Sequence, residues 1–141
     1  MSSQQVENSD SIVKPRNINV INRPTAHLFV YGTLVEPRRL AEVLGHRPQG
    51  QVLGACLRGF RRVTTPTYEF PFVVPDPTAS VDGVLVMDLD AEDLRRLDQY
   101  EDVADGLYRR VGVDVEVWGG GPTPATVRAD TYAAGPGLLN Q

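Results

Sequence analysis

Short runs of apolar, β-prone residues recur along this chain between Gly, Pro and Asp residues, and this spacing predicts β-strands. In the clearest run, residues 108–118, Val113 and Val115 point to one side while Gly112 and Asp114 point to the other. The pattern predicts five or six strands, at residues 28–30, 50–63, 70–75, 81–89, 108–118 and 125–132.

Two segments have helical spacing instead. Residues 37–44 place apolar side chains on one stripe, with Pro37 suited to the first turn and Gly45 to the end. Residues 91–100 follow Asp90, whose side chain is a good N-cap. We therefore expect two short helices.

Glycines and prolines predict where the strands bend or end. Gly54 and Gly59 indicate bulges or strong curvature in one strand, while Asp76 and Pro77 predict a turn. Gly and Pro residues at 119–122 predict the turn of a hairpin. Together the elements predict an α+β domain: a small mixed, mostly antiparallel five- to six-stranded β-barrel with short flanking helices.

The length of 141 residues fits one compact domain. Residues 1–25, rich in Ser, Gln, Asn and Asp, predict a flexible N-terminal tail; the domain is expected at 26–133, and 134–141 reads as a C-terminal tail. The net charge is −4, and no basic cluster exceeds Arg58, Arg61 and Arg62. Nucleic acid is therefore not an expected partner.

The remaining composition favours a cytoplasmic protein. The single cysteine, Cys56, excludes an intrachain disulfide, and His27 and His46 are too far apart in sequence to suggest a metal site. No apolar run approaches the ~20 residues of a membrane span. We expect no metal, no cofactor and no membrane partner, and the sequence leaves the oligomeric state open.

The first candidate site follows the first strand, where the chain reads Tyr31, Gly32, Thr33, Leu34. A glycine here permits backbone angles that other residues avoid and lets a ligand approach the main chain. Successive N–H groups in such a turn can converge into an anion-binding concavity. An ordinary strand-to-helix turn would use the same residues.

The second candidate is Glu101. On a helix it shares a face with Leu94 and Leu97. A carboxylate among leucines is costly unless it is paired, protonated or used in chemistry. A glutamate that reaches water from the last turn, or one paired with an arginine, would be the structural alternatives.

These stretches, together with a later Tyr108-Arg109-Arg110 element, resemble the γ-glutamylcyclotransferase-like superfamily, which includes the γ-glutamylamine cyclotransferases and the plant AIG2-like proteins. The resemblance runs from about His27 to Tyr132. It implies a six-stranded barrel whose cavity holds the turn and the glutamate. It also implies a reaction without a cofactor, in which the α-amine of a γ-glutamyl amine or peptide attacks its own γ-carbonyl and releases 5-oxoproline and the amine.

The resemblance gives the residues their expected roles. Glu101 would be the general acid and base. Backbone N–H groups of the turn would hold the substrate α-carboxylate, and tyrosines would enforce the folded geometry. The expected substrate-binding residues are Tyr31, Gly32, Thr33, Leu34 and Tyr108, and the possible further ones are Arg110, Phe70, Pro71 and Tyr132. Core packing is the alternative for Tyr108 and Tyr132, and exposure or an ion pair is the alternative for Arg110.

Two departures from the family pattern affect these expectations. The glycine that usually follows the glutamate is Asp102 here, whose charge would raise the pKa of Glu101 if the two carboxylates were close. The chain also ends soon after Tyr132, without the C-terminal helix of many members, so the leaving amine stays undetermined. The competing hypotheses are a non-catalytic small-ligand-binding or interaction protein on the same barrel, and a purely structural barrel.

Overall fold

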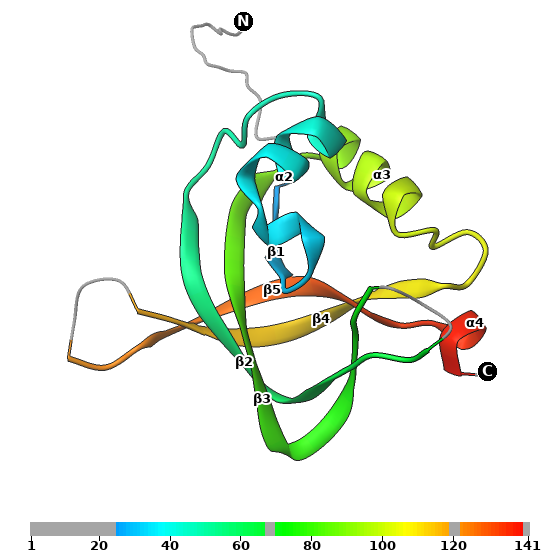
Figure 1. Ribbon diagram of the computed structural model, residues 1–141. Helices are drawn as coiled ribbons and strands as arrows, with labels where there is room; N and C mark the ends of the chain where they lie inside the picture. The colour runs from blue at the N-terminus through cyan, green and yellow to red at the C-terminus, as the bar shows by residue number, and fades with distance from the viewer. Residues whose placement is uncertain (1–24, 67–69, 119–121, 140–141) are drawn as a thin grey trace, which may run out of the picture.

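The computed structural model describes residues 25–66, 70–118 and 122–139. Five strands close into a barrel in the order β1-β3-β2-β4-β5. They are β1 (Ala26–Val30), β2 (Val52–Val63), β3 (Phe72–Leu89), β4 (Tyr108–Val117) and β5 (Ala125–Ala134). The helical elements are η1 (Thr33–Val35), α2 (Pro37–Leu44), α3 (Ala91–Tyr100) and α4 (Pro136–Leu139). Figure 1 shows α2 and α3 together at one end of the barrel.

The predicted α+β fold is confirmed, with five strands. β1 pairs with β5 in parallel, and the other neighbours pair antiparallel. The expected hairpin is the long β4–β5 ladder, from Tyr108↔Ala134 to Val117↔Ala125. Its turn includes residues 119–121, which lie outside the described residues.

Strand β3 merges two strands that the sequence predicts as separate. The register against β2 jumps from Arg58↔Ser80 to Phe60↔Pro75, so residues 76–79 leave the ladder without ending the strand. The Asp76 carboxylate accepts hydrogen bonds at 3.0 and 2.8 Å from the N–H and hydroxyl two residues later. The Asp-Pro signal therefore marks a bend within β3, and the prediction of two separate strands on either side of it is wrong.

The two strand glycines differ. Gly59 has φ +87° and lies at the register shift, so the predicted bulge is confirmed there. Gly54 pairs with Val84 in an unbroken ladder, and the bulge predicted at Gly54 is wrong. A Cβ at Gly54 would meet nothing within 4 Å, so the packing does not require glycine at that position.

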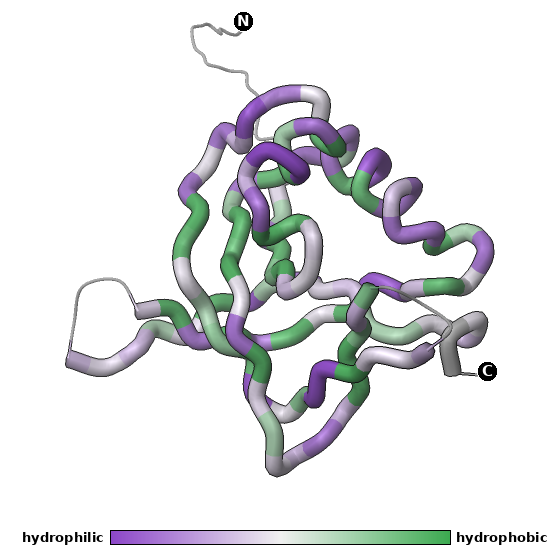
Figure 2. Tube along the Cα trace, in the orientation of Figure 1, coloured by the Kyte–Doolittle hydropathy of each residue, from purple (hydrophilic) through white to green (hydrophobic). Residues whose placement is uncertain are grey.

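The buried side chains form two clusters. Consecutive strand residues point to opposite faces, so Leu28 and Phe29, both fully buried, belong to different clusters. Phe29 packs with strand residues such as Val115, whereas Leu28 packs with helix residues such as Leu40 and Leu97. Figure 2 shows the corresponding apolar stretches along the strands and helices. The cluster that contains Leu28 anchors the two helices on the barrel.

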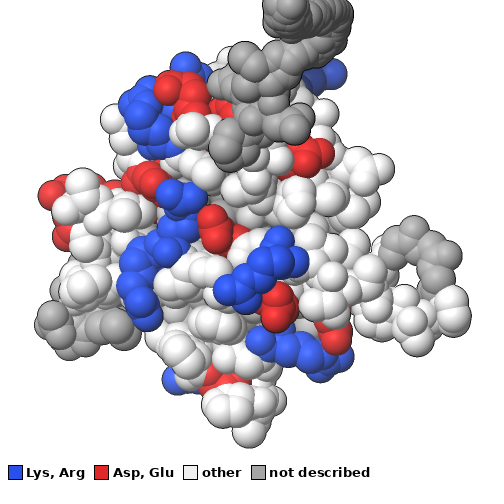
Figure 3. Space-filling view, turned by 180° about the vertical axis from the view of Figure 1, so that it is seen from behind, with Lys and Arg blue, Asp and Glu red and all other residues white. Residues whose placement is uncertain are grey.

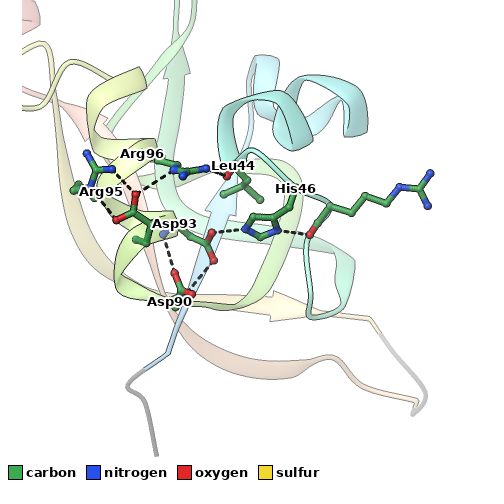
Figure 4. Close-up of polar contacts among 8 residues, drawn as sticks. Leu44, His46, Asp90, Asp93, Arg95 and Arg96 are labelled. Atoms are coloured by element: carbon green, nitrogen blue, oxygen red, sulfur yellow. Dashed lines mark hydrogen bonds and ion pairs between the residues drawn. The ribbon is translucent and has the colours of Figure 1, made fainter.

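Polar contacts fix the N-terminal end of α3 (Figure 4). Asp90 Oδ1 accepts from the Asp93 N–H at 2.9 Å, and Asp93 Oδ2 accepts from the Asp90 N–H at 3.1 Å, so the predicted cap is a full capping box. Asp93 Oδ1 lies 2.7 Å from His46 Nε2, and Arg96 Nη1 donates to the Leu44 carbonyl at 2.5 Å. These contacts tie α3 to the end of α2.

The N-terminal tail expected at 1–25 falls, except for residue 25, outside the described residues. The segment expected as a C-terminal tail contains α4, and it contacts the loop before β4: Gly135 N–H donates to the Leu107 carbonyl at 2.9 Å, and Gly137 N–H to the Gly106 carbonyl at 2.7 Å. Its apolar residues are too few to reveal this docking by periodicity.

Charges of both signs are interspersed on the surface in Figure 3. Arg58 pairs with Glu116 at 3.0 Å and Arg61 with Asp76 at 3.3 Å, so two of the three clustered arginines are matched by carboxylates. Within the described ranges, no helix is long and apolar enough to cross a membrane.

Candidate active site

A cavity of about 400 Å³ lies where η1, the end of α3 and the start of β4 meet. All of the site residues expected from the sequence except Arg110 line it. The structure thus brings the turn after β1 together with the glutamate after α3 and the tyrosine that opens β4, although the turn is far from both of them in the chain. Lining residues that the sequence did not single out include Arg39, Tyr100 and Leu107.

The turn after β1 presents three N–H groups in succession. The first hydrogen bonds of η1 run from the Val35 N–H to the Gly32 carbonyl at 3.1 Å and from the Glu36 N–H to the Thr33 carbonyl at 3.2 Å. The N–H groups of Gly32, Thr33 and Leu34 precede these bonds, as at any helix start, and donate to no acceptor within residues 25–66, 70–118 and 122–139.

Gly32 lies in a crowded part of the wall, and its φ is not unusual. Its φ is −117°, so the expectation of a φ that other residues avoid is wrong, although its ψ of −131° lies outside the main allowed regions. A Cβ at this position would lie 3.3 Å from Pro71 Cγ, a tight contact on the wall of the cavity. Close approach of the two chain segments therefore accounts for the glycine.

Glu101 is the C-cap of α3, and its N–H donates to the Leu97 carbonyl at 2.9 Å. Its side chain is half-buried, and burial raises its pKa from 4.5 to about 7. Among the described residues the carboxylate has neither an ion-pair partner nor a hydrogen-bond donor. The arginine pair considered as a structural alternative is not present in this part of the chain.

Three buried tyrosines surround this carboxylate, and its negative charge contributes to raising the pKa of each. Burial is the main cause of all three upward shifts, so the hydroxyls stay protonated at neutral pH. Each hydroxyl donates to an acceptor other than Glu101: Tyr31 to the Tyr132 carbonyl, Tyr108 to the Pro71 carbonyl at 2.6 Å, and Tyr132 to Asp98 Oδ1 at 2.6 Å. The tyrosine side chains are therefore held in place by other acceptors, and their hydroxyls do not donate to the Glu101 carboxylate.

Arg110 takes no part in the lining. Its guanidinium pairs with Asp98 at 3.2 Å and with Asp130 at 3.3 Å, which is the ion-paired alternative for this residue. Asp98 accepts hydrogen bonds from both Arg110 and Tyr132. This pair positions Tyr132 and links α3 to the β4–β5 ladder.

Asp102 does not perturb Glu101. Its side chain is exposed, and its own pKa is raised by a hydrogen bond with Asp105. Its φ of +59° is left-handed, a conformation that glycine favours and aspartate tolerates better than most residues.

Arg39 and Tyr100 are two of the lining residues that the sequence did not predict. Arg39 Nη1 donates to the Tyr100 hydroxyl at 3.3 Å, and this hydroxyl lies 2.9 Å from Thr33 Oγ1. No sequence pattern separates Arg39 from its neighbour Arg38, and only the packing of η1 against the end of α3 shows which of them reaches the cavity. In the described residues, no group of three or more His, Cys, Asp or Glu side chains could hold a metal ion.

Curated relatives support the resemblance. The AIG2-like protein C of Arabidopsis thaliana is 35% identical over 105 residues, which cover 74% of this chain and 56% of that protein. The AIG2-like protein A of the same plant is 30% identical over 88 residues, covering 59% and 52%. The chain thus spans about half the length of the curated relatives it matches.

Solved structures share the fold. The crystal structure of a mouse AIG2-like protein is 27% identical with a TM-score of 0.61, and 82% of each chain is covered. A solution structure from Arabidopsis thaliana is 24% identical with a TM-score of 0.67, covering 80% of this chain and 64% of that one. The sequence profile of the family described as "Gamma-glutamyl cyclotransferase, AIG2-like" matches residues 28–140. The chain therefore belongs to the AIG2-like γ-glutamyl cyclotransferase family.

Proposed function

We propose that this protein is a γ-glutamyl cyclotransferase, which converts a γ-glutamyl amine or peptide to 5-oxoproline and the released amine. One observation carries the proposal: the Glu101 carboxylate is half-buried in the cavity with a pKa of about 7. A group with a pKa near the working pH can both accept and return protons efficiently. Family membership supplies the reaction class, and the glutamate supplies the group that the reaction needs.

Glu101 would act as a proton shuttle. Its carboxylate accepts a proton from the substrate α-ammonium, and the neutral α-nitrogen attacks the γ-carbonyl carbon. The new C–N bond closes the five-membered ring while the bond to the leaving nitrogen breaks. Overall the α-nitrogen gives up two protons and keeps one in the lactam, and the departing nitrogen gains two. One carboxylate can carry these protons in turn, so no other nucleophile is needed.

The turn after β1 would hold the α-carboxylate of the substrate. The N–H groups of Gly32, Thr33 and Leu34 precede the hydrogen bonds of η1 and belong to the cavity lining. Main-chain donors bind an anion without the conformational freedom of a lysine side chain. An α-carboxylate placed here would keep the adjacent α-ammonium inside the same cavity as Glu101.

The tyrosine walls would enforce the folded conformation. Ring closure gains most from holding the attacking nitrogen near the γ-carbonyl, and such orientation contributes several kcal/mol to rate acceleration. Tyr31 and Tyr108 are buried, and both hydroxyls are held by backbone carbonyls. Their rings therefore do not need to reorganise during turnover.

The decisive experiment is to incubate the protein with a panel of γ-glutamyl amines, amino acids and peptides and to measure 5-oxoproline by mass spectrometry. Formation of 5-oxoproline that is lost in Glu101→Gln supports the proposal. Binding of γ-glutamyl compounds by calorimetry without any turnover would instead support the non-catalytic ligand-binding alternative.

A further inference from the structure

The carboxylate of Asp98 joins helix α3 to a wall of the cavity without lining the cavity itself. Its Oδ1 accepts from the Tyr132 hydroxyl at 2.6 Å and lies 3.2 Å from Arg110 Nε, and its Oδ2 accepts from Arg110 Nη2 at 3.3 Å. The side chain of Asp98 is 29% exposed, and Tyr132 is fully buried. Hydrogen bonds to an ionised acceptor are stronger than those between neutral groups, so this contact holds the Tyr132 ring firmly.

The β4–β5 ladder presents the partners of Asp98 on one face. Arg110 and Tyr132 are direct cross-strand neighbours, so their side chains lie side by side. Tyr108, two residues before Arg110, and Asp130, two residues before Tyr132, share this face. Asp130 also pairs with the Arg110 guanidinium at 3.3 Å. Asp98 therefore contacts the same face of the ladder from which Tyr108 and Tyr132 line the cavity.

Tyr132 connects this contact to a second wall of the cavity. Its hydroxyl donates to Asp98, and its main-chain carbonyl accepts from the Tyr31 hydroxyl. On the helix, Asp98 and Glu101 are three residues apart, a spacing at which side chains are neighbours on the helix surface. The Asp98–Tyr132 hydrogen bond therefore links the end of α3, where Glu101 lies, to both tyrosines.

We propose that Asp98 is a positioning residue for the reaction: by holding the Tyr132 hydroxyl, it keeps the Glu101 carboxylate against the tyrosine walls. The inference rests on the proposed function, in which Glu101 moves the protons. A misplacement of about 1 Å can lower a rate by about 10²-fold. Without the Asp98–Tyr132 contact, the end of α3 would separate from the ladder and water would reach Glu101.

Burial of Glu101 gives this displacement a measurable signature. The titratable or charged groups that line the cavity with Glu101 are Tyr31, Arg39, Tyr100, Tyr108 and Tyr132. Burial is the cause that raises the pKa of Glu101 from 4.5 to about 7, so a carboxylate that moves into water should titrate closer to 4.5. A variant that merely unfolds in part would lower the measured rate without changing the pKa of its folded molecules.

Two substitutions of Asp98 separate the contact from the charge. Both remove the negative charge, and Arg110 keeps Asp130 in both, but only Asp98→Asn retains an oxygen that can accept from Tyr132. In Asp98→Ala we expect kcat at alkaline pH, where Glu101 is ionised, to fall by about 10- to 100-fold with little change in KM. The pKa of Glu101, followed by NMR of its side-chain carboxyl carbon, should fall from about 7 toward 4.5. Asp98→Asn should keep most of the rate and the raised pKa.

Two further variants complete the comparison. Tyr132→Phe removes the donor and keeps the Asp98 charge, so it should lower the pKa of Glu101 as Asp98→Ala does, and it tests the same contact if Asp98→Ala does not fold. Asp114→Ala is the matched control. It breaks an ion pair with Arg128 at 3.4 Å on the same ladder, and neither residue of this exposed pair lines the cavity. Asp114→Ala should change neither kcat nor the pKa of Glu101.

Three results would overturn the inference. Equal changes in Asp98→Ala and Asp98→Asn would mean that the charge acts and the contact does not. A Glu101 pKa that stays near 7 in both Asp98→Ala and Tyr132→Phe would mean that the contact does not position Glu101, and an unchanged kcat would remove its role in the reaction. The NMR titration needs no substrate. If the wild type cyclises no γ-glutamyl compound, the proposed function is contradicted, whereas a pKa shift in Asp98→Ala that is absent from Asp98→Asn still supports positioning of Glu101 by Asp98.

Discussion

Helix α3 carries a carboxylate at each end, and the two have opposite surroundings. Asp93, in the first turn, is 5% exposed, and its two oxygens contact His46 and the Asp90 N–H. Glu101, at the last turn, is half-buried, and the tyrosine hydroxyls around it donate to other acceptors. Both are enclosed by protein, yet one is fully hydrogen-bonded and the other is not.

This difference distinguishes a carboxylate that stabilises the fold from one whose pKa suits a reaction. A buried carboxylate that accepts hydrogen bonds stabilises the fold, because its partners compensate for lost water. A carboxylate buried without such partners raises the free energy of its charged form, and its pKa moves toward neutrality. Perturbed groups of the second kind cluster at functional sites. The comparison thus supports the proposed role of Glu101 in the reaction, whereas the contacts of Asp93 anchor the helix.

The largest expected effect is on turnover. Glu101→Gln should lower kcat by roughly 10²–10⁴-fold, because the amide cannot take the ammonium proton. It should still fold and bind 5-oxoproline. Asp93→Asn should leave kcat near the wild-type value. Steady-state rates of 5-oxoproline formation measure both, and near-normal turnover by Glu101→Gln would contradict the assignment.

The next effect concerns the anion site. In Gly32→Val the side chain begins at a Cβ position 3.3 Å from Pro71 and occupies the wall of the cavity. We expect 5-oxoproline affinity to fall by at least about tenfold, the equivalent of 1.4 kcal/mol, while the circular dichroism spectrum is retained. Gly54→Val is the control, since a Cβ there meets nothing within 4 Å. Equal affinities for the two variants would exclude the turn as the ligand site.

Glu101 should also cost stability above neutral pH. Its folded pKa of about 7 exceeds its ordinary value of 4.5, so the native state binds the extra proton between these values. The contribution of protonated Glu101 to the free energy of unfolding is therefore fully present below about pH 4.5 and is lost as the pH rises through 7. Glu101→Gln should be more stable than wild type by up to roughly 3 kcal/mol at alkaline pH and equal to it near pH 4.5. Urea unfolding at several pH values measures the difference; a constant gap would refute the raised pKa.

Asp93→Asn should have the converse effect. The asparagine amide would face a donor on one of its two sides, His46 or the Asp90 N–H, and a buried unsatisfied group costs about 1–3 kcal/mol. We expect lower stability with unchanged 5-oxoproline formation. A loss of activity at full stability would instead extend the active site to this end of the helix.

The smallest effect belongs to His46. Its Nδ1 lies 2.6 Å from the Arg47 carbonyl and its Nε2 2.7 Å from Asp93, so both ring nitrogens face acceptors and the doubly protonated ring fits best. The Arg47 carbonyl, followed by Asp93, raises the pKa of His46 above 6.5. The contribution is present below about pH 6.5 and is lost as the pH rises through the higher folded pKa. His46→Gln should therefore lower Tm more in mildly acidic than in alkaline buffer, and this pH dependence should be weaker, but still present, in the Asp93→Asn background, which keeps the Arg47 carbonyl.

Local signals in the sequence predicted much of the fold. Pro37 and Gly45 mark the start and the end of α2, and Asp90 caps α3. The alternation of apolar and polar residues predicted β4. The family resemblance identified Gly32 and Glu101 as candidate site residues, and both line the cavity. The roles assigned to these residues stay predictions until turnover is measured.

The features that could not be predicted from the sequence depend on contacts between segments that are distant in the chain. His46 and Asp93 are 47 positions apart, and nothing local to either residue indicates the other. Arg39 lines the cavity and contacts Tyr100 of α3, whereas Arg38 on the same turn of α2 does not line it. The continuity of β3 was missed because Asp-Pro usually ends a strand, whereas here β3 pairs with β2 on both sides of the bend.

The closure of the barrel sets the order in which the protein becomes functional. The Tyr31 hydroxyl reaches the Tyr132 carbonyl across 101 positions, and Thr131 Oγ1 donates to the Phe29 carbonyl at 2.9 Å across 102. Contacts between such distant segments form late in folding, since loop closure must precede them. A chain emerging from the ribosome therefore completes its cavity only when β5 has been synthesised, and until then Glu101 lies in water with an ordinary acidity. Completion of folding and the rise in the pKa of Glu101 are therefore one event in this barrel.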